Sequence, residues 1–196
     1  MGGIAGLLWP LQGPLGGRAE ATIHPENYLW VAILALIFLL LLLWAIRRWR
    51  AQEAEWRRRE VAEENQRKAR SLYEGAFGVG DLSVVDEVVG EAFFDHREGH
   101  RGPEGLKRVI ANIRRTFPDL RVSVQEQGTE GETVTTRCVL RGTDRGGLLW
   151  YPPTGRRATF AAKYTDRFSD GVLVEHWGES DTGSLLEQLG LPPREG

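Results

Sequence analysis

An uninterrupted apolar run near the start of the chain limits what it can fold into more than any other feature. Residues 29–46 read LWVAILALIFLLLLLWAI, without a charge, a glycine or a proline. With Tyr28 included, the run spans about 28 Å as a helix at ~1.5 Å per residue, close to the hydrocarbon thickness of a bilayer. A buried core helix would show a polar stripe, and a signal peptide would have a basic segment before the run and a small-residue cleavage site. We therefore expect residues 28–46 to form a single-pass transmembrane helix.

The residues that flank this run indicate the membrane boundaries and the orientation. Aromatic residues lie at both ends, and basic residues follow the C-terminal end, as is typical of membrane-water interfaces. The expected interface residues are Tyr28, Trp30, Trp44, Arg47, Arg48, Trp49 and Arg50. Nine basic residues fall within positions 47–70, whereas only Arg18 precedes the run. The positive-inside rule then places the N-terminus outside and residues 47–196 in the cytoplasm.

Composition divides the rest of the chain into segments. Residues 1–27 are rich in glycine and proline and are expected to form an extracytoplasmic tail. Residues 47–66 consist largely of Arg, Glu, Ala and Gln, with opposite charges four positions apart, which predicts a charged helix leaving the membrane. Residues 67–191 form the expected folded domain, and residues 192–196 a short tail.

Arginine outnumbers lysine 22 to 3, which is typical of a GC-rich bacterial genome, so the expected location is a bacterial inner membrane.

The charge and cysteine content exclude several function classes. The net charge of −2 gives no basic field for nucleic acid, so no nucleic-acid partner is expected. Cys138 is the one cysteine, which excludes an intrachain disulfide and a cysteine-based zinc site. The sequence also lacks a phosphate-binding glycine loop and a recognisable nucleophile motif. We expect no metal and no cofactor.

Hydrophobic periodicity in the domain predicts helices followed by strands. Apolar positions repeat at helical spacing over residues 69–77, 82–89 and 106–117, and residues 93–96 read as a short extended piece. Alternating patterns then predict four strands, at 120–124, 134–140, 158–168 and 172–177. The second strand has Val134, Thr136, Cys138 and Leu140 on one face, and the third has Ala158, Phe160, Ala162, Tyr164, Asp166 and Phe168. Asp181 is placed to cap a closing helix. The expected fold class is α+β, with three helices against a curved antiparallel sheet.

A series of short motifs in a fixed order gives the domain a family resemblance. The motifs are Phe94-Asp95-His96, Gly102-Pro103-Glu104-Gly105, Phe117-Pro118-Asp119-Leu120, Pro152-Pro153-Thr154-Gly155-Arg156, Phe168-Ser169-Asp170-Gly171, Val174-Glu175-His176-Trp177-Gly178-Glu179-Ser180-Asp181 and Gln188-Leu189-Gly190. In this order they resemble the SnoaL-like polyketide (ester) cyclase family, within the nuclear transport factor 2-like cone fold. The resemblance covers residues 67–191 and implies a cone whose cavity takes flat, apolar ligands.

The resemblance also implies a reaction and the residues that perform it. In the cyclases, a pocket carboxylate removes a proton alpha to a carbonyl and drives an intramolecular aldol ring closure without metal or cofactor. Asp181 matches the position of that carboxylate, and His96 matches a second pocket position. The remaining expected pocket residues are Trp177, Glu175, Tyr164, Phe160 and Arg137. Because an interior carboxylate needs a partner, Arg137 and Arg141, which share one face of the second strand, are candidate partners of Glu175.

Each of these residues has a structural alternative. Asp181 is equally well placed to do no more than cap the last helix, and His96 to be a hydrogen-bonded core residue. Trp177 is expected to fill the cone under either interpretation.

Two departures from the family pattern bear on catalysis: the hairpin at residues 142–146 lacks a histidine that many relatives carry, and the loop between His96 and Gly102 is short.

Two functions of different classes fit these observations. The sequence favours a non-catalytic membrane subunit, in which the helix packs beside other subunits of a bacterial membrane complex, photosynthetic or respiratory, and the cone domain is a cytoplasmic scaffold. The alternative is a membrane-tethered cyclase or isomerase that acts on a lipophilic, polyketide-like substrate bound in the cone. The expected partners are the membrane, other membrane-protein subunits and a small apolar ligand.

Overall fold

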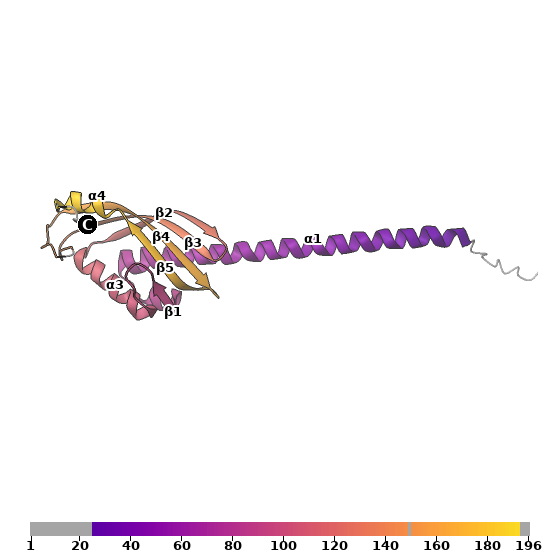
Figure 1. The fold of residues 1–196 in the computed structure, drawn as a ribbon, viewed down its shortest axis with the longest axis horizontal. Coiled ribbons are helices and arrows are strands. Elements are labelled where there is room, and N and C mark those ends of the chain that lie inside the picture. Colours follow the sequence, from indigo (N-terminus) through magenta and orange to yellow (C-terminus); the bar gives the residue numbers. More distant parts are fainter. Residues whose placement is uncertain (1–24, 149, 193–196) are drawn as a thin grey trace, which may run out of the picture. The chain divides into compact units, whose positions relative to one another are not determined.

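A computed structural model of the chain describes residues 25–148 and 150–192 (Figure 1). Its internal contacts divide the chain into two units, residues 1–51 and residues 52–196, and each is described by itself. Most of the expected tail at residues 1–27, and residues 193–196 of the C-terminal tail, lie outside the described residues.

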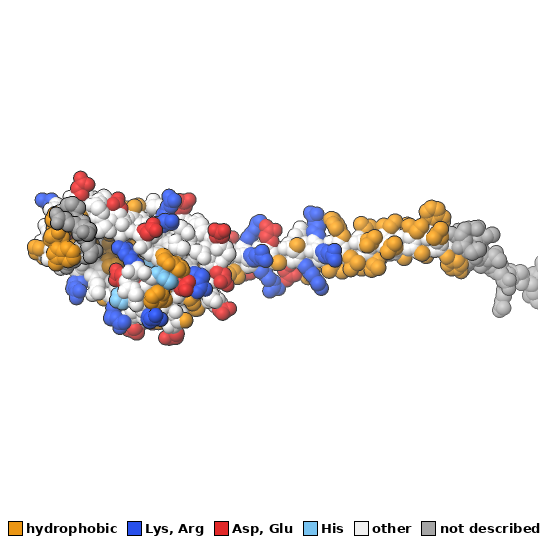
Figure 2. Space-filling view, viewed as in Figure 1, with side chains coloured by type: hydrophobic (Ala, Val, Ile, Leu, Met, Phe, Trp, Pro, Cys, Tyr) orange, Lys and Arg blue, Asp and Glu red, His pale blue; other side chains and the backbone are white. Residues whose placement is uncertain are grey.

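The first unit contains the apolar part of helix α1, which runs over Pro25–Ser71. The apolar side chains that the structure describes here are all exposed, including Tyr28, Trp30, Trp44 and Trp49. Figure 2 shows hydrophobic side chains along the visible face of this stretch. Arg48 lies over the Trp44 ring, with its guanidinium carbon 5.4 Å from the ring centroid. By length and composition, α1 is able to cross a membrane.

The second unit is built on a five-stranded mixed sheet with strand order β1-β5-β4-β3-β2. The strands are β1 (Val89–Asp95), β2 (Arg121–Glu130), β3 (Thr133–Thr143), β4 (Arg157–Ser169) and β5 (Val172–Ser180). Strands β2 to β5 form the expected antiparallel meander. The expected extended piece at residues 93–96 belongs largely to β1, which pairs in parallel with β5. The sheet is therefore mixed rather than wholly antiparallel, and the expected α+β class is confirmed.

Short helices complete the unit, and most of their ends follow from local sequence. After α1, the π-helix η1 covers Leu72–Val79, followed by α2 (Ser83–Val88), α3 (Gly102–Thr116) and α4 (Thr182–Leu189). Gly80 ends η1 in the left-handed region at φ 94°, which a residue with a Cβ rarely adopts. Pro103 lies in the first turn of α3, where its missing N–H costs no hydrogen bond. Helix η1 contacts β2, and α3 contacts β1.

The core lies between these helices and one face of the sheet. Strand β3 buries every second residue from Val134 to Leu140, which confirms the alternation that the sequence predicts. On β4 the expected face is also the inner one: Phe160 is half-buried, and the other five members are buried. From the helices, Leu72 and Tyr73 of η1 and Ile110 of α3 are almost fully buried.

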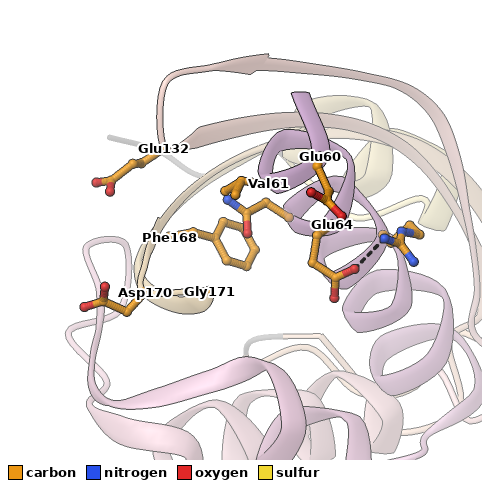
Figure 3. Close-up of a pocket in the computed structure, with 9 residues that line it drawn as sticks. Glu60, Val61, Glu64, Glu132, Phe168, Asp170 and Gly171 are labelled. Atoms are coloured by element: carbon orange, nitrogen blue, oxygen red, sulfur yellow. Dashed lines mark ion pairs between the residues drawn. The ribbon is translucent and has the colours of Figure 1, made fainter. Parts of the chain in front are cut away.

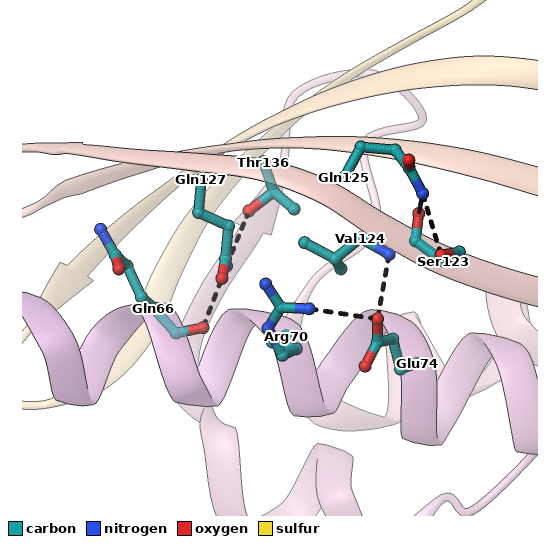
Figure 4. A network of polar contacts seen from close by, with 8 residues as sticks. All are labelled: Gln66, Arg70, Glu74, Ser123, Val124, Gln125, Gln127 and Thr136. Carbon is teal, nitrogen blue, oxygen red and sulfur yellow. Dashed lines mark hydrogen bonds and ion pairs between the residues drawn. The ribbon is translucent and has the colours of Figure 1, made fainter.

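Polar contacts attach the end of α1 and the start of η1 to β2 (Figure 4). Gln127 donates from Nε2 to the backbone oxygen of Gln66 at 3.0 Å and to Thr136 at 3.3 Å. The Val124 N–H donates to the Glu74 carboxylate at 2.9 Å. Because β2 is an edge strand with an irregular register at Val124, this N–H needs a partner outside the ladder. These contacts fix the helix over the sheet and so position Tyr73.

Candidate functional site

An irregularity in β5 decides which of its side chains face the core. Phe168 of β4 pairs with Leu173, but the preceding Arg167 pairs with Glu175, so Val174 is an extra residue on β5. Such a bulge reverses the alternation of the strand beyond it. Leu173 and His176 are therefore both buried although they are three residues apart. Beyond the bulge, His176 takes the interior position that the sequence analysis gave to Trp177.

The interior position of His176 completes a chain of three buried polar side chains. Asp166 of β4 is fully buried and lies directly across from His176 in the β4–β5 pairing. The Nδ1 atom of His176 lies 2.8 Å from Oδ1 of Asp166. Tyr73 of η1 donates its hydroxyl to Oδ2 of the same carboxylate at 2.5 Å. Each carboxylate oxygen thus has a partner, which offsets the cost of burying Asp166.

The pKa values of Tyr73 and His176, the two side chains that contact Asp166, are both shifted by their surroundings. Burial raises the pKa of Tyr73 well above its ordinary value, and the charge and hydrogen bond of Asp166 raise it further. Tyr73 therefore remains a hydrogen-bond donor to Asp166. Burial alone would lower the pKa of His176, but the hydrogen bond and charge of Asp166, together with the charge of Asp95, outweigh it, so the net pKa is raised. Two of the three groups are thus tuned through one carboxylate.

The surroundings of His176 leave its second ring nitrogen, Nε2, beside a glycine. A Cβ placed on Gly178 would lie 3.2 Å from Nε2, so the absence of a side chain there keeps this nitrogen clear. Tyr164 packs on the inner side, with its ring stacked on Tyr73 at 4.4 Å. The positive charge of Arg97 lowers the pKa of His176 and so opposes Asp166. With Nδ1 held by Asp166, Nε2 is the atom that can exchange a proton.

The structure brings three expected site residues together, but outside the core. His96 stacks on Trp177 with ring centroids 4.3 Å apart and planes 8° apart. The Nε2 of His96 lies 3.9 Å from Oε1 of Glu175. Trp177 is 38% exposed, so the expectation that it fills the cone is wrong. The reason is the bulge at Val174, which turns Glu175 and Trp177 away from the interior.

Glu175 pairs with a different arginine from the two that the sequence suggested. Arg167 of β4 donates from Nε to Oε2 of Glu175 at 2.7 Å, and this hydrogen bond is the main reason that the pKa of Glu175 is lowered. Arg137 lies on the exposed face of β3, 3.7 Å from Glu126. Arg141 is likewise exposed. The pairing of Glu175 with Arg137 or Arg141 was wrong, because these arginines alternate with the buried residues of β3.

Asp181 caps the closing helix, as the structural alternative expects. Its Oδ1 accepts the N–H of Ser184 at 3.0 Å, and the residue is exposed. Asp181 and Arg137 line one groove of about 640 Å³ on the sheet. Phe160 and Tyr164 belong to the inner face of β4, as expected. The catalytic role of Asp181 and of His96, and the ligand-binding roles of the pocket residues, remain predictions.

Tyr73, Asp166 and His176 were not predicted as one site, although the sequence carries signals for two of them. Tyr73 lies in the apolar stripe of residues 69–77, and Asp166 is the one carboxylate on the inward face of β4. A carboxylate among apolar residues needs hydrogen-bond donors, so that spacing alone pointed to a buried polar group. The third member, His176, can be placed in the interior only when the position of the bulge in β5 is known.

Comparisons with known proteins agree with the fold and extend to sequence. The profile of the SnoaL-like polyketide cyclase family matches residues 67–189. Nogalonic acid methyl ester cyclase of Streptomyces nogalater is 30% identical over 123 residues, which cover 60% of this chain and 91% of the relative. Aklanonic acid methyl ester cyclase DauD of Streptomyces sp. strain C5 is 27% identical over 111 residues, which cover 56% of this chain and 68% of the relative.

Solved structures show the same relationship. IdmH, a candidate polyketide cyclase of Streptomyces antibioticus, matches with a TM-score of 0.56 and 34% identity, over 65% of this chain and 99% of IdmH. TsrD of Streptomyces laurentii matches in fold with a TM-score of 0.61 and 24% identity, over 68% of this chain and 98% of TsrD. The match over residues 67–189 extends from the end of α1 to α4 and includes Tyr73, Asp166 and His176. The chain therefore belongs to the SnoaL-like polyketide cyclase family.

Proposed function

We propose that the chain is a membrane-anchored cyclase, in which His176 acts as the proton acceptor of an intramolecular aldol ring closure. The observation that carries the proposal is the buried chain in which Tyr73 and Asp166 hold Nδ1 of His176 and leave Nε2 clear. A base held in one tautomer by a carboxylate is suited to removing a proton from carbon. The relatives named above as ester cyclases support a reaction of this class.

The proposed reaction is an isomerisation, so its atoms balance without a further reactant. Nε2 of neutral His176 takes a proton from the carbon alpha to the substrate ester, and an enolate forms. The enolate carbon attacks a carbonyl of the same molecule, a carbon–carbon bond closes the ring, and the new alkoxide recovers the proton from the imidazolium. Arg97, which donates to Oγ of Ser180 at 3.2 Å near the end of β5 and whose charge acts on His176, is the proposed electrostatic partner of the developing oxyanion.

The proposed substrate is a lipophilic methyl ester with a polyketide skeleton. Two relatives carry the names of methyl ester cyclases, and aromatic rings surround the proposed base: Phe93 and Tyr164 lie 6.5 and 5.5 Å from the His176 ring. The apolar stretch of α1 is the proposed anchor in a bacterial inner membrane, with residues 47–196 in the cytoplasm. An anchor of this kind would hold the enzyme where a lipophilic substrate partitions.

The test is ring closure of nogalonic acid methyl ester by the full-length chain in dodecyl maltoside. His176→Gln should lower kcat/KM by about 10²-fold or more, since general-base catalysis contributes ~10²–10⁴-fold. His100→Gln is the matched control, because His100 is a partly exposed histidine whose nearest ion-pair partner is Glu98. Asp181→Asn should leave the rate unchanged. Loss of turnover in Asp181→Asn, with turnover kept in His176→Gln, would assign the base to Asp181 instead.

A second candidate function is a non-catalytic subunit of a membrane complex. The observation that favours it is the filled interior, where Tyr73, Phe93 and Tyr164 are buried around the proposed base. Copurification from native membranes in mild detergent tests this function. A stable assembly that persists in both His176→Gln and Asp181→Asn, together with no turnover by the wild-type chain, would favour the subunit over the cyclase.

A further inference from the structure

Three arginines directly follow the apolar stretch of α1, and we call Arg47, Arg48 and Arg50 the interfacial arginines. Their side chains are exposed, and they belong to the first unit together with the apolar stretch. Figure 2 shows Lys and Arg side chains where the hydrophobic surface of the helix ends. By length and composition that stretch is able to cross a membrane. The interfacial arginines therefore lie where such a span would leave the hydrocarbon.

The charge of the interfacial arginines is not compensated by the protein. In the part of the chain that the structure describes, none of them forms an ion pair with a carboxylate. The first acidic residue after the apolar stretch is Glu53, and its carboxylate pairs with Arg57 at 2.7 Å. Arg48 contacts a ring instead, with its guanidinium carbon 5.4 Å from the centroid of Trp44. A cation–π contact leaves the charge of the guanidinium in place, so three positive charges remain.

The basic residues farther along α1 differ, because carboxylates accompany them. Residues 53–70 contain six basic and five acidic side chains, whereas residues 47–52 contain three basic and no acidic ones. In the second unit, for example, Arg67 pairs with Glu64 at 2.5 Å (Figure 3). Uncompensated positive charge on α1 is thus concentrated in the turn that follows the apolar stretch.

The spacing of the interfacial arginines suits several lipid headgroups rather than one. At ~100° of rotation per residue they cover roughly 160° of the helix circumference, with Trp44 among them and Trp49 on the opposite side. A guanidinium donates two parallel hydrogen bonds to phosphate oxygens. Phosphatidylglycerol and phosphatidylcholine both carry a phosphate, but the choline group adds a positive charge that cancels it. The arginines therefore discriminate between lipids by net charge.

We propose that the interfacial arginines bind the headgroups of anionic phospholipids, such as phosphatidylglycerol, at the surface of the membrane that α1 crosses. The proposal rests on the membrane anchor of the proposed function and adds the class of lipid that the anchor selects. Each basic residue close to an anionic membrane surface contributes to binding. The partner is the lipid surface rather than free phosphate, because the adjoining apolar stretch holds the arginines among the headgroups.

The first experiment measures lipid selectivity by electron paramagnetic resonance. The full-length chain is reconstituted into phosphatidylcholine vesicles that contain a trace of spin-labelled phosphatidylglycerol or spin-labelled phosphatidylcholine. Phosphatidylglycerol should associate with the chain about fivefold more strongly or more, the effect of at least one basic residue near the surface. Raising the KCl concentration from about 0.1 M to about 1 M shortens the Debye length from ~10 Å to ~3 Å and should remove the preference. An excess of glycerol 3-phosphate, the soluble headgroup, should not displace the labelled lipid.

The second experiment tests the residues with variants. Replacing all three interfacial arginines by glutamine should make the two lipids associate equally. If this variant does not insert, the three single Arg→Gln variants retain two basic residues each, and each should lower the preference for phosphatidylglycerol. The matched control is Arg108→Gln combined with Arg141→Gln and Arg157→Gln, which removes three exposed charges of the second unit and should keep the preference.

Several outcomes would overturn the proposal. Equal association of both lipids with the wild-type chain would mean that the arginines do not select lipids by charge. An equal loss of preference in the control triple variant would mean a general charge effect. Displacement by glycerol 3-phosphate would make this a site for free phosphate. A chain that stays out of the vesicles would overturn the anchor itself. His176→Gln should keep the lipid preference, so failure of the proposed catalysis and failure of lipid selection are distinguishable.

Discussion

Asp166 and His176 are direct cross-strand neighbours on β4 and β5, and their side chains meet inside the domain at 2.8 Å. A cross-strand pair on a buried face has little freedom, because both backbones are fixed by the sheet ladder. Tyr73 then holds the other carboxylate oxygen from the helical side. The sheet and the helix layer therefore both determine the orientation of one imidazole.

Asp166→Asn should change the pH profile of the proposed reaction. In the wild-type chain the pKa of His176 is raised above its ordinary value of 6.5, so kcat/KM should rise with pH and level off only above that raised pKa. Without the Asp166 charge, burial dominates and lowers the pKa of His176, so the inflection should move to lower pH. The plateau value of kcat/KM at high pH should fall by about 10²-fold, because the imidazole is no longer held in one tautomer. An unchanged inflection would contradict the pairing.

Tyr73→Phe should destabilise the domain by about 1–3 kcal/mol, because it leaves a buried carboxylate oxygen without its donor. The side chain is fully buried and its hydroxyl lies 2.5 Å from Asp166, whereas the aromatic packing is kept in phenylalanine. Urea denaturation followed by near-UV circular dichroism measures the loss. Tyr151→Phe, outside the core, is the matched control and should change stability by less than about 0.5 kcal/mol.

Gly178→Ala should reduce turnover more than it reduces stability. A Cβ at this position would lie 3.2 Å from Nε2 of His176 and 3.4 Å from the Tyr164 ring, so the imidazole has to move. We expect a changed imidazole resonance for His176 in NMR and a lower kcat. Gly128→Ala is the control, because a Cβ there meets nothing within 4 Å. Equal rates for the two variants would mean that Nε2 does not need the clearance.

The proposed topology predicts that the C-terminal end of the chain lies in the cytoplasm. A reporter fused after Gly196 should be active only if that reporter functions in the cytoplasm, because nine basic residues follow the apolar run and one precedes it. Alkaline phosphatase, which needs the periplasm, and green fluorescent protein, which needs the cytoplasm, give opposite signals. Phosphatase activity of the C-terminal fusion would reverse the orientation.

The sequence predicted those parts of the fold that depend on local periodicity. The inner faces of β3 and β4 were correct because regular alternation was enough to define them. The interior of β5 was wrong because Val174 is an extra residue, and no composition signal marked it. The parallel pairing of β1 with β5 joins segments some eighty residues apart, which periodicity does not encode. The residues most displaced from their expected positions were therefore those on β5, Glu175 and Trp177.

Solvent deuterium exchange directly measures proton transfer at the substrate carbon, the step proposed for His176. The full-length chain in dodecyl maltoside is incubated in D₂O with nogalonic acid methyl ester, and deuterium at the carbon alpha to the ester is followed by NMR. If His176 is the base, exchange should depend on the enzyme and rise with pH through the raised pKa of His176. His176→Gln should abolish this exchange, and His100→Gln should not. Exchange that is unaffected by His176→Gln would mean that another group removes the proton.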